Sequence, residues 1–378
     1  MTKKNRQSSK KKPASALLTF KELTKKIDNP RITLSLARSQ DSISSFPELI
    51  KLIKLNPRLF GKTFNQPFPA FPKHLDYISP LYQTTFEREL KWAATYLNIY
   101  SNEINKFLVL ANEFQKFLLL SDYKECEEIL SSIEQTFGYS YWYIKNKIAF
   151  LQISKGLEEQ KAFANFIREK SSNNPSLIAY FFSLLNEKNV TPGKYYHALD
   201  SVLEIPFSKE FKDYLKFHLR PYMLNAITEL HNVLSYEAGG AVVDYYETYI
   251  SICQIIVSSG HEKLFPSVAQ SLEILGEHIN DRRIQYLLFE LKDEYSFELS
   301  KSSVNEALQT FFEGNFKESY QFCKDKLMES PYDFDLIEIA AMSLSLIGDF
   351  SFETGNTYIE KLRWFNFSRG KTLCKMRG

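Results

Sequence analysis

The sequence predicts an all-α protein arranged as an α-solenoid of antiparallel helix pairs. Glycine and proline are scarce, with 13 and 14 among 378 residues, whereas hydrophobic residues make up 44%. Few helix breakers and many large apolar side chains favour helices over a turn-rich sheet. Apolar residues recur at three- and four-residue spacing in many segments, as on one face of a helix. Gly314-Asn315-Phe316 and Gly348-Asp349-Phe350 stand 34 residues apart, an interval typical of repeated helix pairs.

Charge separates the two ends of the chain from the rest. Residues 1–21 carry seven Lys or Arg and no acid, and residues 361–378 carry six and no acid. Residues 22–360 therefore have a net charge of −11, which disfavours long-range attraction to nucleic-acid phosphates. Basic ends can bind nucleic acid or anionic lipid or act as an import signal, but they are more often solvated. We expect residues 1–14 to be a basic, disordered tail and residues 366–378 to be a second basic tail.

Residues 15–80 are expected to form a helical cap followed by a proline-rich connector. No single helix can run through this connector, because proline lacks the amide proton that a helix interior needs. The spacing of Pro69 and Pro72 also matches a P-x-x-P ligand. The favoured interpretation is an ordered connector whose aromatic side chains, Phe68 and Phe71, pack on neighbouring helices. Five of the fourteen prolines cluster here: Pro57, Pro67, Pro69, Pro72 and Pro80.

Residues 81–299 are expected to be degenerate helical repeats. A weak copy of the 34-residue pattern lies at about 110–190. Ser121-Asp122-Tyr123 stands where a Gly-Asp-Tyr turn is expected, and Gly156 follows 35 residues later. The aromatic run 137–150 has only Lys145 and Lys147 beside its rings, so core packing is favoured over base stacking. Residues 191–299 show helical stripes but no period.

The clearest repeat lies at 300–350, within a predicted repeat region at 300–365. Ala307 and Ser319 supply small residues on two successive helices, Gly314 and Phe316 form the turn between them, and Pro331 ends the second helix. Ala341, Gly348 and Phe350 repeat the pattern. These residues resemble a tetratricopeptide repeat, in which small side chains let paired helices approach closely. The resemblance covers one full repeat and the first half of the next.

This resemblance implies a concave face that binds a segment of a partner protein. The chaperone-binding members of the family clamp a carboxylate with Lys and Asn, but this sequence has Val304, Leu308 and Ile339 at the matching positions. That clamp is therefore not implied. A mixed apolar and acidic face suits a basic, amphipathic partner segment. The residues expected to line it are Val304, Leu308, Phe311, Asp335, Glu338 and Met342.

No linear motif for catalysis, phosphate binding or metal binding is found. The six histidines form no H-x-x-x-H pair, and the four cysteines form no C-x-x-C pair. Glu277-His278 and Asp281-Arg282-Arg283 are interpreted as a surface ion-pair group. Cys126, Cys253 and Cys323 are interpreted as buried small residues on apolar helix faces. We therefore predict no catalytic residues, no cofactor and no metal.

The function predicted from the sequence is that of a non-enzymatic interaction scaffold or regulatory subunit within a larger complex. An alternative is a nucleic-acid-associated helical repeat protein that uses its basic termini. No apolar run approaches the ~20 residues of a membrane span. A cytoplasmic location is expected, and the basic N-terminal tail would also suit nuclear import.

Overall fold

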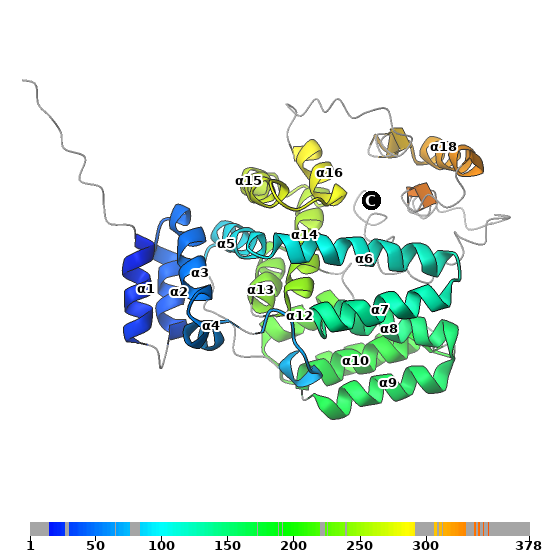
Figure 1. The fold of residues 1–378 in the computed structure, drawn as a ribbon. Helices are drawn as coiled ribbons and strands as arrows, with labels where there is room; N and C mark the ends of the chain where they lie inside the picture. Colours follow the sequence, from blue (N-terminus) through cyan, green and yellow to red (C-terminus); the bar gives the residue numbers. More distant parts are fainter. Residues whose placement is uncertain are drawn as a thin grey trace, which may run out of the picture.

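The structure is a computed structural model of the chain. It describes residues 15–26, 30–64, 66–75, 84–171, 173–187, 189–190, 192–219, 224, 226–238 and 240–291, and then 306–307, 310–311, 313–329 and six positions between 336 and 347. Every regular element in these ranges is a helix, and none is a strand (Figure 1). The predicted all-α class is confirmed. No helix among the described residues is both long enough and apolar enough to cross a membrane.

The first helices form an N-terminal module. It contains α1 (Ser15–Lys25), α2 (Pro30–Gln40), η1 (Ile43–Ser45), α3 (Phe46–Lys54) and α4 (Pro57–Thr63). Helix α1 packs on α2 and α3, and α4 packs on the same two helices. Asn56 begins α4 by accepting a hydrogen bond from the Leu59 amide at 3.1 Å, while Pro57 occupies the first helical turn, where it costs no backbone hydrogen bond.

A buried ion pair joins this module to α5 (Phe86–Asn98). The guanidinium of Arg38 on α2 pairs with the carboxylate of Glu89, and both side chains are almost fully buried. The same guanidinium lies 5.1 Å from the ring centroid of Trp92. Arg88 adds two hydrogen bonds to backbone carbonyls, at 2.7 Å to Arg38 and 2.5 Å to Asp41. These contacts fix the end of α2 against α5.

Five helices then follow one another along the chain and pack together (Figure 1). They are α6 (Ser101–Leu119), α7 (Tyr123–Phe137), α8 (Tyr141–Ser154), α9 (Leu157–Lys170) and α10 (Asn173–Asn186), and each packs on the next. Ser121, the expected turn residue, has a positive φ of 59°, and Gly156 has a φ of 98°. Asp122 accepts a hydrogen bond from the Glu125 amide at 3.3 Å and so begins α7. Both predicted turns are therefore present.

The following helices return to the start of this group of helices. They are α11 (Pro192–Leu203), α12 (Lys209–Leu219), α13 (Ile227–Glu237), α14 (Val242–Ser258), η4 (Glu262–Leu264), α15 (Phe265–Gly276) and α16 (Arg282–Leu291). Helices α13, α14 and α15 all pack against α5, and α14 also packs on α6 and α8. In an open repeat array, each unit contacts only its neighbours. Here helices far apart in the sequence share one hydrophobic cluster that includes residues from Ala16 to Leu288.

The proline-rich connector is held between two helix turns, with η2 (Pro72–Leu75) at its end. The Pro69 carbonyl accepts a hydrogen bond from the Tyr139 amide at 2.7 Å, and the Pro67 carbonyl accepts one from Val242 at 2.9 Å. The Phe68 ring packs edge-on against Tyr100 and Phe137. The interpretation as an ordered connector is confirmed for Phe68, whereas Phe71 is 57% exposed.

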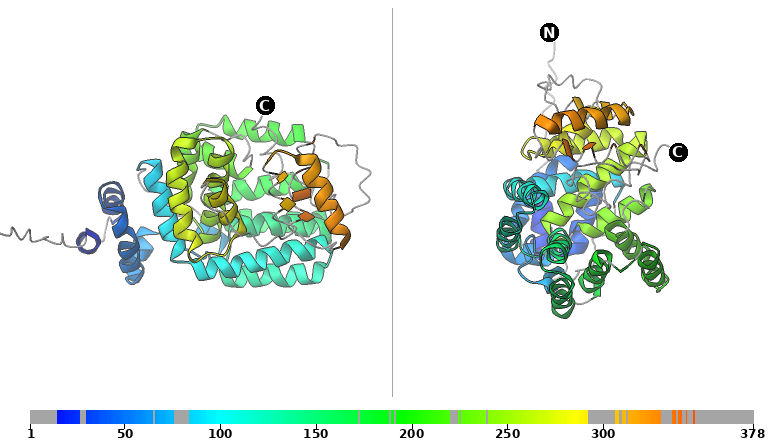
Figure 2. Two further views of the ribbon diagram at one scale, coloured as in Figure 1. Left: turned by 90° about the horizontal axis from the view of Figure 1, so that it is seen from above. Right: turned by 90° about the vertical axis from the view of Figure 1, so that its right-hand side faces the viewer.

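The described C-terminal residues form a second, smaller cluster. Ser319 on α18 (Phe316–Glu329) donates a hydrogen bond to the Ala307 carbonyl at 2.8 Å, and both residues are fully buried. Gly314 has a φ of 84°, as expected for the turn between two helices. Gly348 lies outside the described residues. Figures 1 and 2 show α15, α16 and α18 on the same side of α6, away from α9.

Candidate functional site

The predicted partner face lies almost wholly outside the described residues. Val304, Leu308, Asp335, Glu338 and Met342 are all outside them. Phe311, the sixth residue, is only 3% exposed, and its ring packs edge-on against Phe316 at 5.3 Å. Phe311 therefore fills space inside the C-terminal helix pair and offers almost no surface to a partner.

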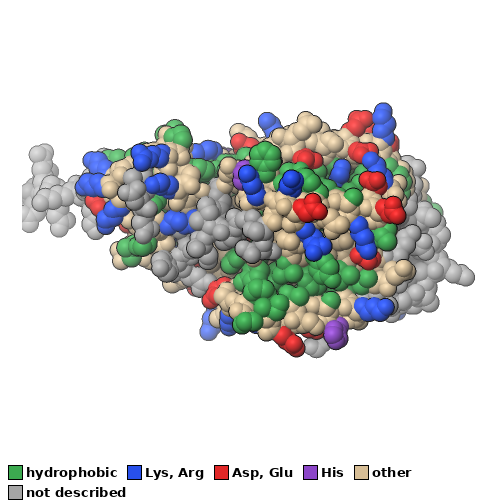
Figure 3. Space-filling model, turned by 90° about the horizontal axis from the view of Figure 1, so that it is seen from below, with side chains coloured by type: hydrophobic (Ala, Val, Ile, Leu, Met, Phe, Trp, Pro, Cys, Tyr) green, Lys and Arg blue, Asp and Glu red, His purple; other side chains and the backbone are tan. Residues whose placement is uncertain are grey.

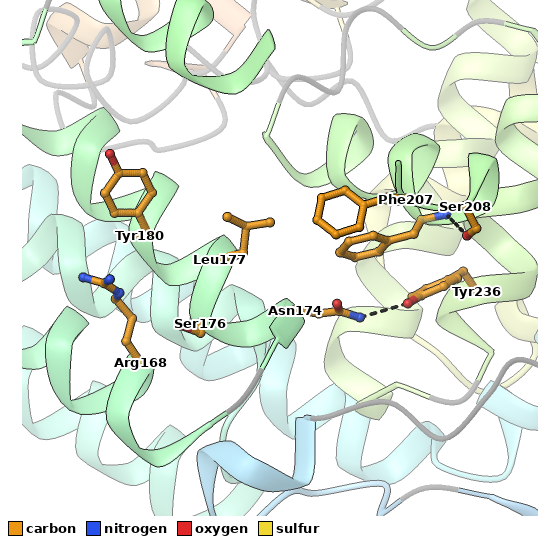
Figure 4. Close-up of a pocket in the computed structure, with 9 residues that line it drawn as sticks. Arg168, Asn174, Ser176, Leu177, Tyr180, Phe207, Ser208 and Tyr236 are labelled. Atoms are coloured by element: carbon orange, nitrogen blue, oxygen red, sulfur yellow. Dashed lines mark hydrogen bonds between the residues drawn. The ribbon is translucent and has the colours of Figure 1, made fainter. Parts of the chain in front are cut away.

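A groove of about 660 Å³ lies elsewhere, between α9 and α10 on one side and α12 and α13 on the other (Figure 4). Local sequence signals explain its edges. Pro175 falls in the first turn of α10, and the Ser208 hydroxyl accepts a hydrogen bond from the Phe211 amide at 3.2 Å at the start of α12. Its lining residues are Arg168, Asn174, Ser176, Leu177, Tyr180, Phe207, Ser208, Phe211 and Tyr236.

Aromatic rings that pack on one another form one wall of the groove. The Phe207 ring meets Phe211 edge-on at 5.0 Å, and Phe211 lies 6.0 Å from Tyr236. The Tyr214 ring supports Tyr236 from behind at 4.5 Å. Asn174 on α10 donates a hydrogen bond to the Tyr236 hydroxyl at 2.9 Å and so ties the two walls together. Burial raises the pKa of Tyr236 to about 12, so its hydroxyl is neutral at pH 7.

The opposite wall carries an exposed aromatic ring and a cation. Tyr180 is 38% exposed, and the Arg168 guanidinium lies 5.5 Å from its ring centroid. Arg168 also donates a hydrogen bond to Asn165 at 3.3 Å, and no carboxylate pairs with it among the described residues. Figure 3 shows hydrophobic side chains gathered in one broad patch on the underside of the molecule. An apolar side chain with a negative charge beside it would match such a groove.

Buried polar groups hold the helices behind the groove. His218 on α12 lies 3.0 Å from the Glu237 carboxylate on α13. Asp244 on α14 accepts hydrogen bonds from the Tyr141 and Trp142 amides, at 2.7 and 2.9 Å, at the start of α8. Burial and the nearby charge of Glu237 raise the pKa of Asp244. The bonds of Asp244 fasten α14 to α8.

The interpretation of this polar group as a surface ion-pair group was wrong for Asp281, which is buried, whereas Glu277, His278 and Arg282 are exposed. Arg283 donates two 2.8 Å hydrogen bonds to Glu247 on α14 and also binds Asp281. Tyr246 donates a 2.7 Å hydrogen bond to the same aspartate, which is 7% exposed. The sequence could not show that Glu247 and Tyr246 of α14 pack against Asp281 and Arg283. The charges fix α16 to α14.

The described cysteines and potential metal ligands form no reactive or metal-binding group. Burial raises the pKa of the Cys126 and Cys253 thiols to about 12, and all three described cysteines are buried. This confirms their interpretation as small core residues. The aromatic run 137–150 is also confirmed as core, since Phe137, Tyr143 and Phe150 are at most 1% exposed. No group of three or more potential metal ligands occurs among the described residues.

Comparisons with protein-family models, with curated proteins and with solved structures found no match to this chain. The groove itself could not be found from the sequence. Its walls come from residues as far apart as Arg168 and Tyr236, with no common motif. The local signals at Pro175 and Ser208 predict helix starts but no cavity.

Proposed function

We propose that this chain is a non-enzymatic interaction subunit that binds a segment of a partner protein in the groove between α10 and α12. The single observation that carries this proposal is the groove itself, with its aromatic wall and its exposed Tyr180 and Arg168. Aromatic and arginine side chains dominate the energetics of protein interfaces. A volume of about 660 Å³ lies in the range of sites that enclose a small ligand or a few side chains.

The helix arrangement supports a scaffold role. The antiparallel neighbours α6 to α10 and the resemblance of residues 300–350 to a tetratricopeptide repeat suit a solenoid-like segment. We propose that α13, α14 and α15 close this segment against α5, which makes the walls of the groove rigid. A rigid groove loses little conformational entropy when a partner binds. The C-terminal face around Asp335 and Glu338 remains a second proposed contact.

Site-directed photo-crosslinking tests the groove. A photoreactive phenylalanine analogue replaces Tyr180 in the full-length chain, and the same analogue replaces Phe289 on α16 as a matched control. Both native side chains are partly exposed aromatics, at 38% and 43%. We expect crosslinks from position 180 to one or a few proteins of the native cell, and none of these from position 289.

A substitution within the groove provides a second test. With the crosslinker at position 180, Leu177→Asp should place a charge in the groove and lower the crosslinked yield about tenfold or more, while the far-ultraviolet circular dichroism stays unchanged. An equal set of crosslinks from both positions, or an unchanged yield in the Leu177→Asp chain, would show that the groove is not the binding site.

A further inference from the structure

The charge of the chain is strongly polarised along its length. Residues 15–75 contain ten Lys or Arg and four Asp or Glu, a net charge of +6. Residues 76–360 have a net charge of −16. Within the N-terminal module the bias is sharper, since residues 49–75 contain five Lys or Arg and no acid at all. The described helices therefore carry a basic region in addition to the basic N-terminal tail.

Much of this charge lies at one end of the module. The Thr19 hydroxyl donates a 2.6 Å hydrogen bond to Asp41, so the start of α1 lies beside the end of α2. Helix α3 begins near the end of α2 and runs antiparallel to α2. The end of α3 and helix α4 therefore lie beside the end of α1 and the start of α2 (Figure 1). We call this surface the basic end. Its exposed cations are Lys25, Lys26, Lys51, Lys54, Arg58 and Lys62.

Among the described residues of the basic end, few acids offset these cations. Glu22 pairs with Lys25 at 3.3 Å, and Lys54 lies 4.2 Å from the centroid of the Tyr100 ring. Lys51 and Arg58 have no carboxylate partner among the described residues. Figure 3 views the molecule from below and shows Lys and Arg side chains gathered on the N-terminal module at the left. Such a surface attracts an anionic partner.

Exposed aliphatic side chains accompany the cations. Leu55 joins α3 to α4, lies next to Lys54 in the sequence and is 73% exposed. Ile32 at the start of α2 is 46% exposed. Contacts to nucleic-acid phosphates use charged and hydrogen-bonding groups, so they give no role to these two residues. At a lipid bilayer, cations contact anionic headgroups while aliphatic side chains enter the boundary with the acyl chains.

We propose that the basic end of the N-terminal module binds the surface of an anionic lipid membrane. Lys51 and Arg58 contact the headgroup charges, and Leu55 between them enters the headgroup boundary. This binding is peripheral and needs no spanning helix. It is also independent of the groove, which lies on other helices, so the chain can bind a protein segment and a membrane surface together.

Vesicle co-sedimentation of the full-length chain tests this proposal. The probe is phosphatidylcholine vesicles with about one third phosphatidylserine, compared with pure phosphatidylcholine vesicles. We expect binding only to the anionic vesicles, and weaker binding as salt shortens the range of the attraction. Lys51→Gln with Arg58→Gln should weaken binding about 30-fold, since each cation near such a surface contributes about fivefold. Leu55→Ser should weaken it about tenfold through lost apolar burial.

The control removes two exposed lysines from elsewhere. Lys263→Gln with Lys317→Gln makes the same change in net charge outside the module and should leave vesicle binding within twofold. Equal losses in the two double variants would show only a net-charge effect and overturn the proposal. If the Lys51→Gln, Arg58→Gln variant binds anionic vesicles as tightly as the native chain, the basic tails at the two ends of the chain bind them instead. That result would also overturn the proposal. The proposal is likewise wrong if duplex RNA or DNA binds more tightly than the vesicles and Leu55→Ser has no effect.

Discussion

Gly138 shows how a single residue can fix the connector. It ends α7 with a φ of 67°, and a Cβ built on it would lie 2.2 Å from the Pro69 carbonyl oxygen. We therefore predict that Gly138→Ala is strained in its backbone and also displaces the connector. Gly156 has a similar positive φ of 98°, but a Cβ there would meet nothing within 4 Å. Both glycines combine a positive φ with a ψ near 180° (−152° at Gly138 and −175° at Gly156), which only glycine adopts readily, so Gly156→Ala should cost about 1–3 kcal/mol through backbone strain alone.

Urea unfolding of the two variants separates backbone strain from the clash. Gly138→Ala should lower the free energy of unfolding by about 2 kcal/mol or more, and the excess over Gly156→Ala measures the connector contact. Equal losses in the two variants would mean that the connector moves aside at little cost.

Some conformations of single residues could be predicted from the sequence, and others could not. The turns at Ser121 and Gly314 could be predicted from turn residues placed at a repeat interval, which is local information. The pairing of Arg38 with Glu89 joins residues 51 positions apart. No sequence pattern near either residue predicts this ion pair, because the contact depends on how α2 packs against α5.

Among helices, the start of α8 depends on α14. The Tyr141 and Trp142 amides belong to the first turn of α8, where backbone donors lack partners within the helix, and Asp244 accepts both hydrogen bonds. Asp244→Ala would leave these two donors, one buried and one part-buried, without this acceptor. We predict a loss of about 2–3 kcal/mol in the free energy of unfolding, measured in urea. Asp244→Asn keeps one carbonyl acceptor and should lose less.

The same carboxyl predicts a pH dependence. Its pKa in the folded state is raised by burial and then by the charge of Glu237, above the ~3.9 of an unfolded aspartate. The folded chain therefore holds this proton to higher pH than the unfolded chain does. The stability that Asp244 contributes is complete at acid pH and falls as pH rises from about 4 through the folded pKa. Asp244→Asn cannot titrate, so the advantage of the native chain over this variant should shrink as pH rises. A constant difference in unfolding free energy between pH 4 and 8 would contradict the raised pKa.

Helices with a clear apolar stripe could be predicted as elements. The end of α7 at Gly138 and the extent of α18 follow from stripes and turn residues that lie in one stretch of sequence. The groove could not be predicted, because four helices must first be placed beside one another before Leu177 faces Phe207. Helical periodicity says which face of each helix is buried but not which helix covers it.

On the scale of the whole molecule, the sequence predicted contacts between successive helices, and α6 to α10 have them. The packing of α5 on α13, α14 and α15 was not predicted, because residues 191–299 carry no period that relates them to the first helices. These long-range contacts join the helices into one hydrophobic core, since α5 is buried only when both halves of the chain pack against it.

The small C-terminal cluster is the exception to this single core. It includes Leu119 from α6, whereas the adjacent Leu118 belongs to the main cluster, and each leucine is 7% exposed. We predict that the cluster containing α18 opens separately from the rest, and native-state hydrogen exchange measures this directly. Leu119→Ala should create a cavity under the C-terminal residues and speed amide exchange in α18 about tenfold or more, with α14 unchanged. Leu118→Ala on the same helix should speed exchange in the main core instead. If both variants change exchange in α18 and α14 equally, the two clusters unfold as one unit, and the main core extends to the C-terminal helices.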